Sequence, residues 1–532
     1  MKNSFLILLV FISFFGCSHD DERDSISINT NPTAIVKTNT KSNVKLLLNS
    51  PLVFSKPSNK SLSIAGKALV EKINESNRSI DFAIYGIRDQ DEIIDALVLA
   101  KKRGVKIRGI VDKDIHDENY YSSTERLIKI IGSIVTDHKT DVETLAMKKN
   151  KPFNYTPYCD APNGYDGPVQ CIGYSLNDNQ CIVAAHASKD ELEFKGDIMH
   201  NKFFIFDNKS LWTGSTNTSD SGTGGYNANA SLIIEDSELA LVYKREFEDM
   251  YLHHKFHRNK RVLYKSQYKK GDIEIAFSPQ SYTVERLVRP LIKNSTDYID
   301  LPIFFLTHKK IAGDLIAAYQ RGVKVRVILD ATAATNGYSK HQILRAVGIP
   351  VKVENWGGKM HMKVAVIDGK HLIMGSMNWT SAGERSNDEN TVIIHNAHYS
   401  NEMHNFFNNL WNSIDDRWLK EQPNPEGLTS NSACSDGVDN DFDHVVDNDE
   451  DSCKKEDAFN FATLPYQIVS KGDGYNLIKG NINKKNQKIY ISPASKYYDK
   501  TKINTSYGEK WFCSIYDARE NGWLSYYDYK RK

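Results

Sequence analysis

The chain has 532 residues, 40% of them hydrophobic and 25% charged, which is enough apolar material for a sizeable core and more than one domain. Lysine and arginine (68) nearly balance aspartate and glutamate (67), so the formal net charge is +1. This balance excludes a nucleic-acid binder of the strongly basic kind, and any recognition driven by charge has to be local.

The first 17 residues, MKNSFLILLVFISFFGC, are interpreted as an export signal, because the apolar run is too short for a comfortable membrane span. The Gly16-Cys17 ending resembles a bacterial lipoprotein signal, which implies lipidation of Cys17. The acidic SHDDERD after it resembles a surface-export tag. Residues 18–45, rich in Ser, Thr and Asn, are then a flexible tether. We expect an exported protein of the cell envelope, an outer-membrane lipoprotein exposed at the surface; an ordinary secreted product is the alternative.

Two segments with the same order of predicted elements follow, over residues 46–260 and 270–418. The first contains SIDFAIYGI, DEIIDALVLAKKRG and VKIRGIVD, and the second contains YIDLPIFFL, IAGDLIAAYQRG and VKVRVILD. Apolar strands that alternate with amphipathic helices predict an α/β fold, with a mixed sheet flanked by helices in each half. We expect the two halves to pack face to face about a pseudo-twofold axis.

The first half carries an insertion. Arg103 and His200 are 97 residues apart, whereas Arg321 and His361 are 40 apart, and we assign the 57 extra residues mainly to about 115–190. Because such a segment beside a site often covers it, we interpret it as a lid or substrate-selecting loop. Disulfides are favoured there over a metal cluster in an exported protein. The residues concerned are Cys159, Cys171, Cys181 and His186.

A polar motif occurs once in each half, as MHNKFFIFDNKSLWTGSTN (199–217) and MHMKVAVIDGKHLIMGSMN (360–378). The apolar runs FFIF and VAVI, each followed by Asp-Asn or Asp-Gly, predict a hairpin in both copies. Residues two apart on a strand share a face, so the His and Lys of each copy project together. The matched pairs are His200 with His361, Lys202 with Lys363, Asp207 with Asp368, Ser215 with Ser376, and Asn217 with Asn378.

These residue types suit a phosphodiester. Lysines and neutral donors stabilise the oxyanions of a displacement at phosphorus, and histidine can attack or donate a proton near neutral pH. A carboxylate can fix the tautomer of a histidine, and Glu389 stands in the second half where Asn229 stands in the first. We therefore expect His200 to lack an orienting carboxylate of its own. The predicted phosphate ligands besides the lysines are Ser215, Asn217, Ser376 and Asn378.

The doubled H-x-K-x(4)-D with a following G-S-x-N resembles the phospholipase D superfamily, over roughly residues 50–415. The resemblance implies a phosphohistidine intermediate, with His200 as nucleophile, His361 as acid and then base, and Lys202 and Lys363 on the phosphate. It also implies that one chain completes the site and that catalysis needs no cofactor. Asp207 and Asp368 match the motif, but both lie in predicted turns and suit a structural role equally well.

The resemblance leaves the substrate open, because members of this superfamily act on nucleic acids or on phospholipids. We favour a metal-independent endonuclease. A phospholipase D that releases phosphatidate, held at the membrane by the lipid anchor, is the alternative. A non-catalytic surface binding lipoprotein ranks third.

Residues 430–456 include the aspartate-rich CSDGVDNDFDHVVDNDEDSC, whose carboxylate and amide oxygens suit Ca²⁺. The stretch resembles the calcium-binding repeats of extracellular bacterial and thrombospondin-type proteins. We predict a structural Ca²⁺ here and a disulfide between Cys434 and Cys453. The predicted ligands are Asp439, Asp441, Asp443 and Asp447.

Residues 457–532 interleave Tyr and Trp with Lys and resemble a short C-terminal module of some secreted bacterial nucleases of the staphylococcal type. Lysines beside aromatic rings could hold nucleic acid through phosphate contacts and stacking. A small domain with an ordinary aromatic core is an equally good interpretation.

Overall fold

The computed structural model describes residues 43–148, 169–173, 179–183, 196–260, 268–336, 339–441, 445–447, 453, 478–491 and shorter pieces between 495 and 525. The predicted signal with Cys17, nearly all of the tether, residues 149–168, 174–178 and 184–190 of the predicted insertion, and Asp443 lie outside these residues. No helix in the described ranges is long and apolar enough to cross a lipid bilayer.

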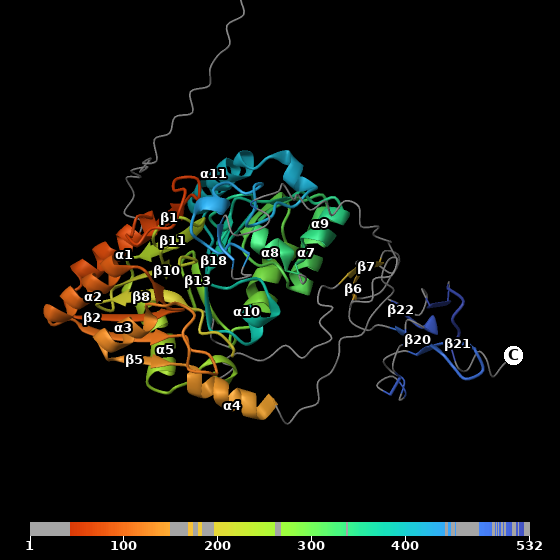
Figure 1. Cartoon of the computed structure of the whole chain (residues 1–532), viewed down its shortest axis with the longest axis horizontal. Coiled ribbons are helices and arrows are strands. Elements are labelled where there is room, and N and C mark those ends of the chain that lie inside the picture. Colours follow the sequence, from red (N-terminus) through yellow and green to blue (C-terminus); the bar gives the residue numbers. More distant parts are fainter. Residues whose placement is uncertain are drawn as a thin grey trace, which may run out of the picture. The chain divides into compact units, whose positions relative to one another are not determined.

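The first repeat is built on a mixed seven-stranded sheet with the order β1-β11-β9-β8-β2-β4-β5 (Figure 1). Strands β2, β4 and β5 are parallel, and the other neighbours pair antiparallel. The strands are β1 Val44–Asn49, β2 Ser79–Ile84, β4 Lys106–Val111, β5 Ile134–Thr136, β8 Lys202–Phe206, β9 Ser210–Gly214 and β11 Asn229–Ile234. The helices are α1 Ile64–Glu75, α2 Asp91–Lys102, α3 Thr124–Ile131, α4 His138–Lys148 and α5 Ser237–Tyr251.

The second repeat has an eight-stranded sheet with the order β12-β13-β19-β18-β17-β14-β15-β16. The strands are β12 Tyr268–Lys270, β13 Ile273–Ser278, β14 Tyr298–Ile303, β15 Lys324–Leu329, β16 Val351–Val353, β17 Ala365–Ile367, β18 His371–Gly375 and β19 Glu389–Ile394. The helices are α6 Arg289–Lys293, α7 Lys309–Gln320, α8 Ala331–Thr335, α9 His341–Ala346, α10 Ser381–Arg385 and α11 Ala397–Ser413.

The seven strands of the first sheet correspond in order to β13-β19-β18-β17-β14-β15-β16 of the second, which has β12 as an additional edge strand. This correspondence confirms the predicted repeat of a mixed sheet flanked by helices. Strand β2 pairs with β4 in parallel and with β8 antiparallel, and β14 pairs with β15 and β17 in the same way. The final helix of each repeat also begins alike, because Asp236 before α5 and Asn396 before α11 accept hydrogen bonds from the first helical N–H groups.

The insertion begins later than the sequence pattern predicts. There are 23 positions from Val111 to Ile134 in the first repeat and 22 from Leu329 to Val351 in the second, so α3 and β5 are shared elements. The extra residues therefore start with α4 rather than at 115. The pattern misplaced this boundary because α9 and β16 are short and were not recognised as the counterparts of α3 and β5.

Within the insertion, strands β6 Val169–Gly173 and β7 Asn179–Val183 form an antiparallel hairpin in which Cys171 and Cys181 are paired positions. The side chains of these cysteines, Cys159 and His186 lie outside the described residues. The disulfide prediction for this segment and its interpretation as a lid therefore stay predictions.

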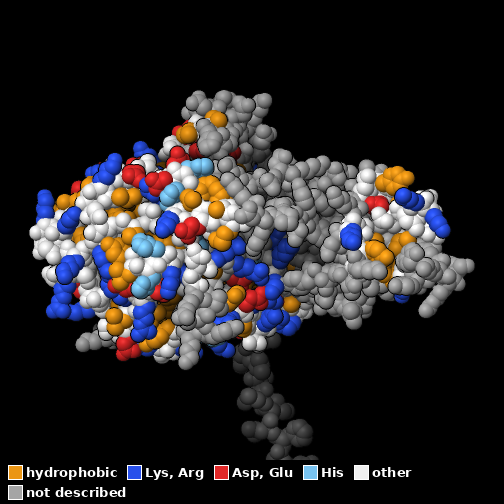
Figure 2. Space-filling view, turned by 90° about the horizontal axis from the view of Figure 1, so that it is seen from below, with side chains coloured by type: hydrophobic (Ala, Val, Ile, Leu, Met, Phe, Trp, Pro, Cys, Tyr) orange, Lys and Arg blue, Asp and Glu red, His pale blue; other side chains and the backbone are white. Residues whose placement is uncertain are grey.

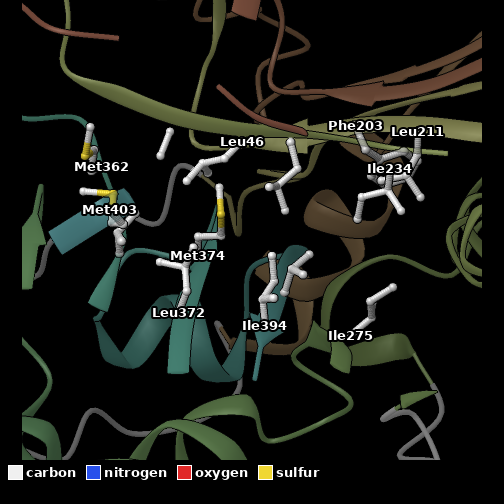
Figure 3. Packing of buried hydrophobic residues seen from close by; sticks show 14 of the residues in the cluster. Leu46, Phe203, Leu211, Ile234, Ile275, Met362, Leu372, Met374, Ile394 and Met403 are labelled. Atoms are coloured by element: carbon white, nitrogen blue, oxygen red, sulfur yellow. The ribbon is translucent and has the colours of Figure 1, made fainter. Parts of the chain in front are cut away.

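The repeats share one hydrophobic core along their seam. Helices α1, α2 and α3 cover the outer face of the first sheet, whereas its inner face packs on α5 and on residues of the second sheet. Figure 3 shows Phe203, Leu211 and Ile234 of the first repeat facing the same cluster as Leu372 and Met374 of the second. Both faces of β8 are covered, which explains why all five residues of Lys202–Phe206 are buried.

Two small elements follow the repeats. The predicted disulfide between Cys434 and Cys453 is present, with an S–S distance of 2.03 Å. The C-terminal strands β20 Ile478–Ile482, β21 Lys488–Ile491 and β22 Lys510–Phe512 form a three-stranded antiparallel sheet. Phe512 and Trp523 are buried in its core, so these two aromatic residues serve packing.

Candidate active site

Each H-x-K motif lies at the start of a central strand. His200 and Lys202 precede and begin β8, and His361 and Lys363 precede β17. In both copies the lysine Nζ donates a hydrogen bond to the carbonyl oxygen of the histidine two residues earlier, at 3.0 Å for Lys202 and 2.8 Å for Lys363. All four side chains are buried. The two residues of each motif therefore share a face, as the strand pattern predicts.

The backbone of each motif is hydrogen-bonded to the opposite repeat. The N–H of His200 donates to the Asp388 carbonyl oxygen at 2.9 Å, and the N–H of His361 donates to the Ala228 carbonyl oxygen at 3.0 Å. Ala228 and Asp388 each immediately precede the strand that carries Asn229 or Glu389. Because of this reciprocal pairing, the two H-x-K motifs lie together with Asn229 and Glu389 where the two repeats meet.

The carboxylate of Glu389 orients His200, although the two residues belong to different repeats. Nδ1 of His200 lies 2.8 and 3.0 Å from the two Glu389 oxygens. Because a carboxylate accepts only, Nδ1 carries the proton and Nε2 keeps a free lone pair. The expectation that His200 lacks an orienting carboxylate is therefore wrong. That expectation assumed that each histidine is oriented by a residue of its own repeat. In the structure each histidine instead contacts the acidic or amide residue of the opposite repeat.

His361 receives neutral partners instead. Its Nδ1 lies 3.1 Å from the Ser215 carbonyl oxygen and 3.2 Å from Asn229 Oδ1, both of which are acceptors. The same tautomer therefore results, with Nε2 available to exchange a proton. The two histidines differ in charge environment, since one faces a carboxylate and the other faces an amide.

Burial and crowding of positive groups depress the pKa values of the four basic side chains. Desolvation, reinforced by nearby lysines and opposed by Glu389, lowers the pKa of His200 to about 4. Burial lowers the pKa of Lys202 to about 7, and those of His361 and Lys363 fall well below their usual values. An anion that entered this cluster would favour the charged forms, so the site is built to take up protons together with an anionic ligand.

The other motif residues divide into two groups. The hydroxyl groups of Ser215 and Ser376 donate to Asn229 Oδ1 and Glu389 Oε2 at 2.9 and 2.6 Å, so they hold the groups that orient the histidines. The hydroxyl oxygens of both serines also accept backbone N–H groups. These contacts differ from the direct phosphate contact that the sequence pattern predicts.

The two asparagines of the motifs keep polar atoms available. Asn217 Nδ2 donates to the hydroxyl group of Tyr121 at 2.8 Å. The Oδ1 atoms of Asn217 and Asn378 are buried and have no hydrogen-bond partner among the described residues. Both asparagines therefore remain candidates for a ligand contact.

Asp207 and Asp368 have a structural position at the far end of their strands. Both adopt left-handed backbone conformations in the hairpin turn, with φ of 52° and 54°. Each carboxylate accepts hydrogen bonds from three consecutive backbone N–H groups that lead into the neighbouring antiparallel strand, β2 or β14. The turn-forming interpretation of these residues therefore fits the structure, and they lie outside the site.

Comparison with known proteins identifies the family. A family model described as "Cardiolipin synthase, PLD-like domain" matches residues 69–251 and 288–411, which is more than half of the chain. The chain belongs to the phospholipase D-like family. Both H-x-K motifs of this phospholipase D-like protein fall inside the matched ranges.

Two curated relatives match part of the chain. A mitochondrial cardiolipin hydrolase from Mus musculus is 32% identical over 133 residues, which is 25% of this chain and 60% of that protein. A phospholipase D from Rickettsia bellii is 30% identical over 132 residues, covering 25% of this chain and 65% of that protein. The chain thus spans less than two thirds of the length of these relatives.

Two solved structures also match parts of this chain. The phospholipase D family member Nuc from Salmonella typhimurium is 26% identical, covers 27% of this chain and 95% of that one, and has a TM-score of 0.26. The phosphatidylserine synthase from Haemophilus influenzae is 11% identical, covers 70% and 86%, and has a TM-score of 0.46.

Aromatic residues that the sequence analysis missed flank both histidines of the phospholipase D-like site. Tyr85 lies beside His200, with ring centroids 5.6 Å apart, and Phe304 lies beside His361 at 4.9 Å. The two aromatics are matched positions, because each directly follows the equivalent strand, β2 or β14. This correspondence was available in SIDFAIY and YIDLPIF. On the first repeat the cluster continues to Tyr120, which is 59% exposed.

The aspartate-rich loop packs on the phospholipase D-like repeats close to the second motif. The Tyr226 hydroxyl donates to Asp436 Oδ2 at 2.6 Å, and Lys359 Nζ donates to the Asn440 carbonyl oxygen at 2.8 Å. Lys359 lies two residues before His361. The loop is therefore part of the support of the site.

A group of carboxylates at the loop, close enough together to hold a cation, differs from the predicted ligand set. Single oxygen atoms of Glu426, Asp439 and Asp441 lie within 4.8 Å of one another. Asp447 instead accepts the backbone N–H groups of Asp436 and Gly437. The sequence analysis missed Glu426 because it precedes the cysteine-bounded stretch.

Proposed function

We propose that this protein is a phosphodiester hydrolase that works through a phosphohistidine intermediate on His200. The observation that carries the proposal is the contact between His200 Nδ1 and Glu389 at 2.8 Å, whereas the partners of His361 Nδ1 among the described residues are a carbonyl and an amide oxygen. A carboxylate beside Nδ1 stabilises the positive charge that the ring gains when Nε2 attacks phosphorus. His200 is therefore better suited to nucleophilic attack than His361.

His361 takes the complementary role. The phosphate of the substrate brings negative charge next to its ring, which favours a proton on Nε2, and this proton is donated to the leaving oxygen. Neutral His361 then accepts a proton from the water that attacks the phosphohistidine. Lys202 and Lys363 stabilise the charge on the non-bridging oxygens, so we propose that these steps need no metal cofactor.

The aromatic surroundings of His200 favour a nucleic acid over a phospholipid as substrate. Tyr85, Tyr120 and Tyr121 form a continuous cluster with ring centroids 5.2 to 5.5 Å apart, and Arg88 lies 5.1 Å from the Tyr121 ring. Tyr120 is the exposed ring of this cluster and offers a base a surface for stacking, and the nearby Arg88 guanidinium group suits a phosphate backbone. On the face shown in Figure 2, acidic and basic side chains are interspersed, so this local cluster carries the preference.

A phospholipase D that acts on membrane lipids is the second candidate. Two observations favour it: relatives are named cardiolipin hydrolase and phospholipase D, and the N-terminal sequence resembles a lipoprotein signal ending at Cys17. We propose that the protein is exported and anchored by Cys17 under either activity. We also propose a structural Ca²⁺ in the aspartate-rich loop, bound by Glu426, Asp439 and Asp441.

The substrate is tested with the purified full-length chain, in the presence of EDTA, on plasmid DNA and on phosphatidylcholine vesicles. Cleavage of DNA that is lost in His200→Ala and in His361→Ala supports the nuclease. Release of choline with intact DNA would establish the phospholipase instead. If the folded wild-type protein acts on neither substrate, a binding role is favoured.

The division of labour is tested with bis(p-nitrophenyl) phosphate, whose leaving group departs without an acid. In His361→Ala the attack on phosphorus should proceed while hydrolysis stalls, so a p-nitrophenylphosphoryl adduct accumulates and is detected by intact-protein mass spectrometry. The matched His200→Ala protein should form no adduct. An adduct on His361 in that variant would assign the nucleophile to the other histidine.

A further inference from the structure

A buried acidic cluster surrounds His257, a residue that the proposed mechanism does not use. His257 is 1% exposed and follows α5 in the first repeat. Its Nε2 atom lies 3.1 Å from Asp137 Oδ2 and 3.5 Å from Asp141 Oδ1, and its Nδ1 atom lies 3.2 Å from Asp388 Oδ2. All three aspartates are fully buried. Buried carboxylates are costly unless they are paired or bind a cation.

Basic side chains cover only part of this charge. Lys260 Nζ lies 2.7 Å from Asp388 Oδ1, but the same ammonium group also pairs with buried Glu246. Across the described ranges, no lysine or arginine forms an ion pair with Asp137 or Asp141. The cluster therefore holds more buried carboxylates than ammonium and guanidinium groups.

The ring of His257 faces the carboxylates without forming hydrogen bonds. Neither Nδ1 nor Nε2 has a hydrogen-bond partner of acceptable geometry among the described residues, and Asp141 Oδ2 also lacks one. The oxygens at 3.1 and 3.5 Å therefore lie off the axis of the ring nitrogen. Ligands that share a metal ion have this arrangement, because metal bonds of about 2.1 Å at tetrahedral or octahedral angles separate ligand atoms by about 3.0 to 3.4 Å.

The second repeat supplies an internal comparison. Asp330 and Glu354 follow β15 and β16, as Asp112 and Asp137 follow β4 and β5. In the second repeat the ammonium group of Lys359 interacts favourably with both carboxylates. The first repeat has Ile198 at the position of that lysine, two residues before His200. It also has Asp141, Asp388 and His257 around the equivalent carboxylate. The balancing cation of the second repeat is thus replaced by a set of ligands.

We propose that Asp137, Asp141 and His257 bind a divalent metal ion of the zinc or manganese class. One ligand atom from each residue lies within 4.8 Å of the others, and two carboxylates with one imidazole suit these ions. Asp388 lies beside the second ring nitrogen, where a carboxylate commonly orients a metal-bound histidine.

The ion has a structural role next to the first motif. Asp137 directly follows β5, and Asp141 lies in the first turn of α4, where the insertion begins. At the end of the insertion, the N–H of Asp197 donates to Asp141 Oδ1 at 3.1 Å and the N–H of Met199 donates to Asp137 Oδ2 at 3.2 Å. The metal therefore fastens both ends of the insertion immediately before His200. This site is independent of the proposed catalytic steps.

The site is tested on the full-length chain purified without chelators, by elemental analysis and by titration with Co²⁺, whose visible absorption reports nitrogen and oxygen ligands. We compare wild type with His257→Gln and Asp141→Asn. Glu143→Gln is the matched control, because it removes an exposed carboxylate from α4, the helix that carries Asp141.

Wild type and Glu143→Gln should bind one equivalent of Co²⁺ with the visible bands, and His257→Gln and Asp141→Asn should lose at least nine tenths of this binding. The melting temperature of the wild-type protein should rise when Zn²⁺ or Mn²⁺ is added. Wild type that takes up none of the three ions overturns the proposal and leaves His257 as an imidazolium held by aspartates. Equal uptake by wild type and folded Asp141→Asn also overturns it, even where His257→Gln fails to fold.

Discussion

Glu389→Gln separates the charge of the orienting residue from its hydrogen bond. The amide oxygen of glutamine can still accept from His200 Nδ1, which now lies 2.8 Å from the carboxylate, so the tautomer and the ring position are retained. The negative charge that faces the ring is lost. In the proposed mechanism this charge matters most when Nε2 has attacked phosphorus and the ring is positive.

The size of the effect follows from the kind of hydrogen bond. A hydrogen bond to a charged group contributes about 1.5 to 3 kcal/mol, compared with about 1 kcal/mol for a neutral pair. A loss of about 0.5 to 2 kcal/mol in the transition state, at 1.36 kcal/mol per tenfold, lowers kcat about 2- to 30-fold. Ser376 Oγ, which donates to Glu389 Oε2 at 2.6 Å, can donate equally well to the amide oxygen.

The assay is hydrolysis of bis(p-nitrophenyl) phosphate, with kcat and KM measured separately between pH 5 and 9. Asn229→Asp is the matched variant, because it places a carboxylate beside His361 Nδ1, now 3.2 Å from the amide oxygen. It should raise the pKa of His361 and move the pH limb of the general acid upward, without the kcat loss seen for Glu389→Gln. A Glu389→Gln enzyme that keeps more than half of kcat would refute the assignment of His200 as nucleophile.

Three further predictions concern stability. Asp207→Ala and Asp368→Ala should each lower the free energy of unfolding by about 2 kcal/mol, because three backbone N–H groups lose their acceptor. The kcat of each variant should change less than twofold. A tenfold loss of kcat at an unchanged urea midpoint would contradict this prediction. Cys434→Ser should lower the free energy of unfolding in urea by about 3 kcal/mol, because the Cys434–Cys453 disulfide closes a loop with a sequence separation of 19. An unchanged urea midpoint would show that closing this loop does not contribute to stability. The pKa of His200 is about 4 in the folded state and about 6.5 in the unfolded state. The free energy of unfolding should therefore fall by up to about 3 kcal/mol as the pH decreases from about 6.5 to about 4. His200→Asn should remove that part of the pH dependence in parallel urea titrations.

The repeat, the mixed sheets and the two H-x-K motifs could be predicted because each is written in local sequence. Alternating strands and helices repeat their order, and His and Lys two residues apart need only a strand to share a face. The turn role of Asp207 could also be weighed in advance, since an aspartate after an apolar run favours a left-handed turn.

Features that depend on packing between repeats could not be predicted. No local pattern says that Glu389 reaches His200, because that contact joins positions 189 residues apart. The missed aromatic pair of Tyr85 and Phe304 becomes visible only when the strands before them are aligned. The start of the insertion was misplaced for a related reason: α9 and β16 are too short to be recognised without their partners in the sheet.

The exchange of partners across the seam also bears on how the site can form. The His200 backbone bonds to Asp388 and its ring to Glu389, so neither contact exists in an isolated first repeat. His200 and Lys202 would then lack the Glu389 carboxylate that offsets them, and burial of unbalanced charge is unfavourable. The first repeat alone should therefore leave its motif solvated and disordered rather than preformed. The proposed catalytic site therefore depends on the packed seam. Met374 of β18 lies in the core that the two repeats share, so Met374→Ala should reduce activity by lowering the fraction of chains in which the repeats are packed together.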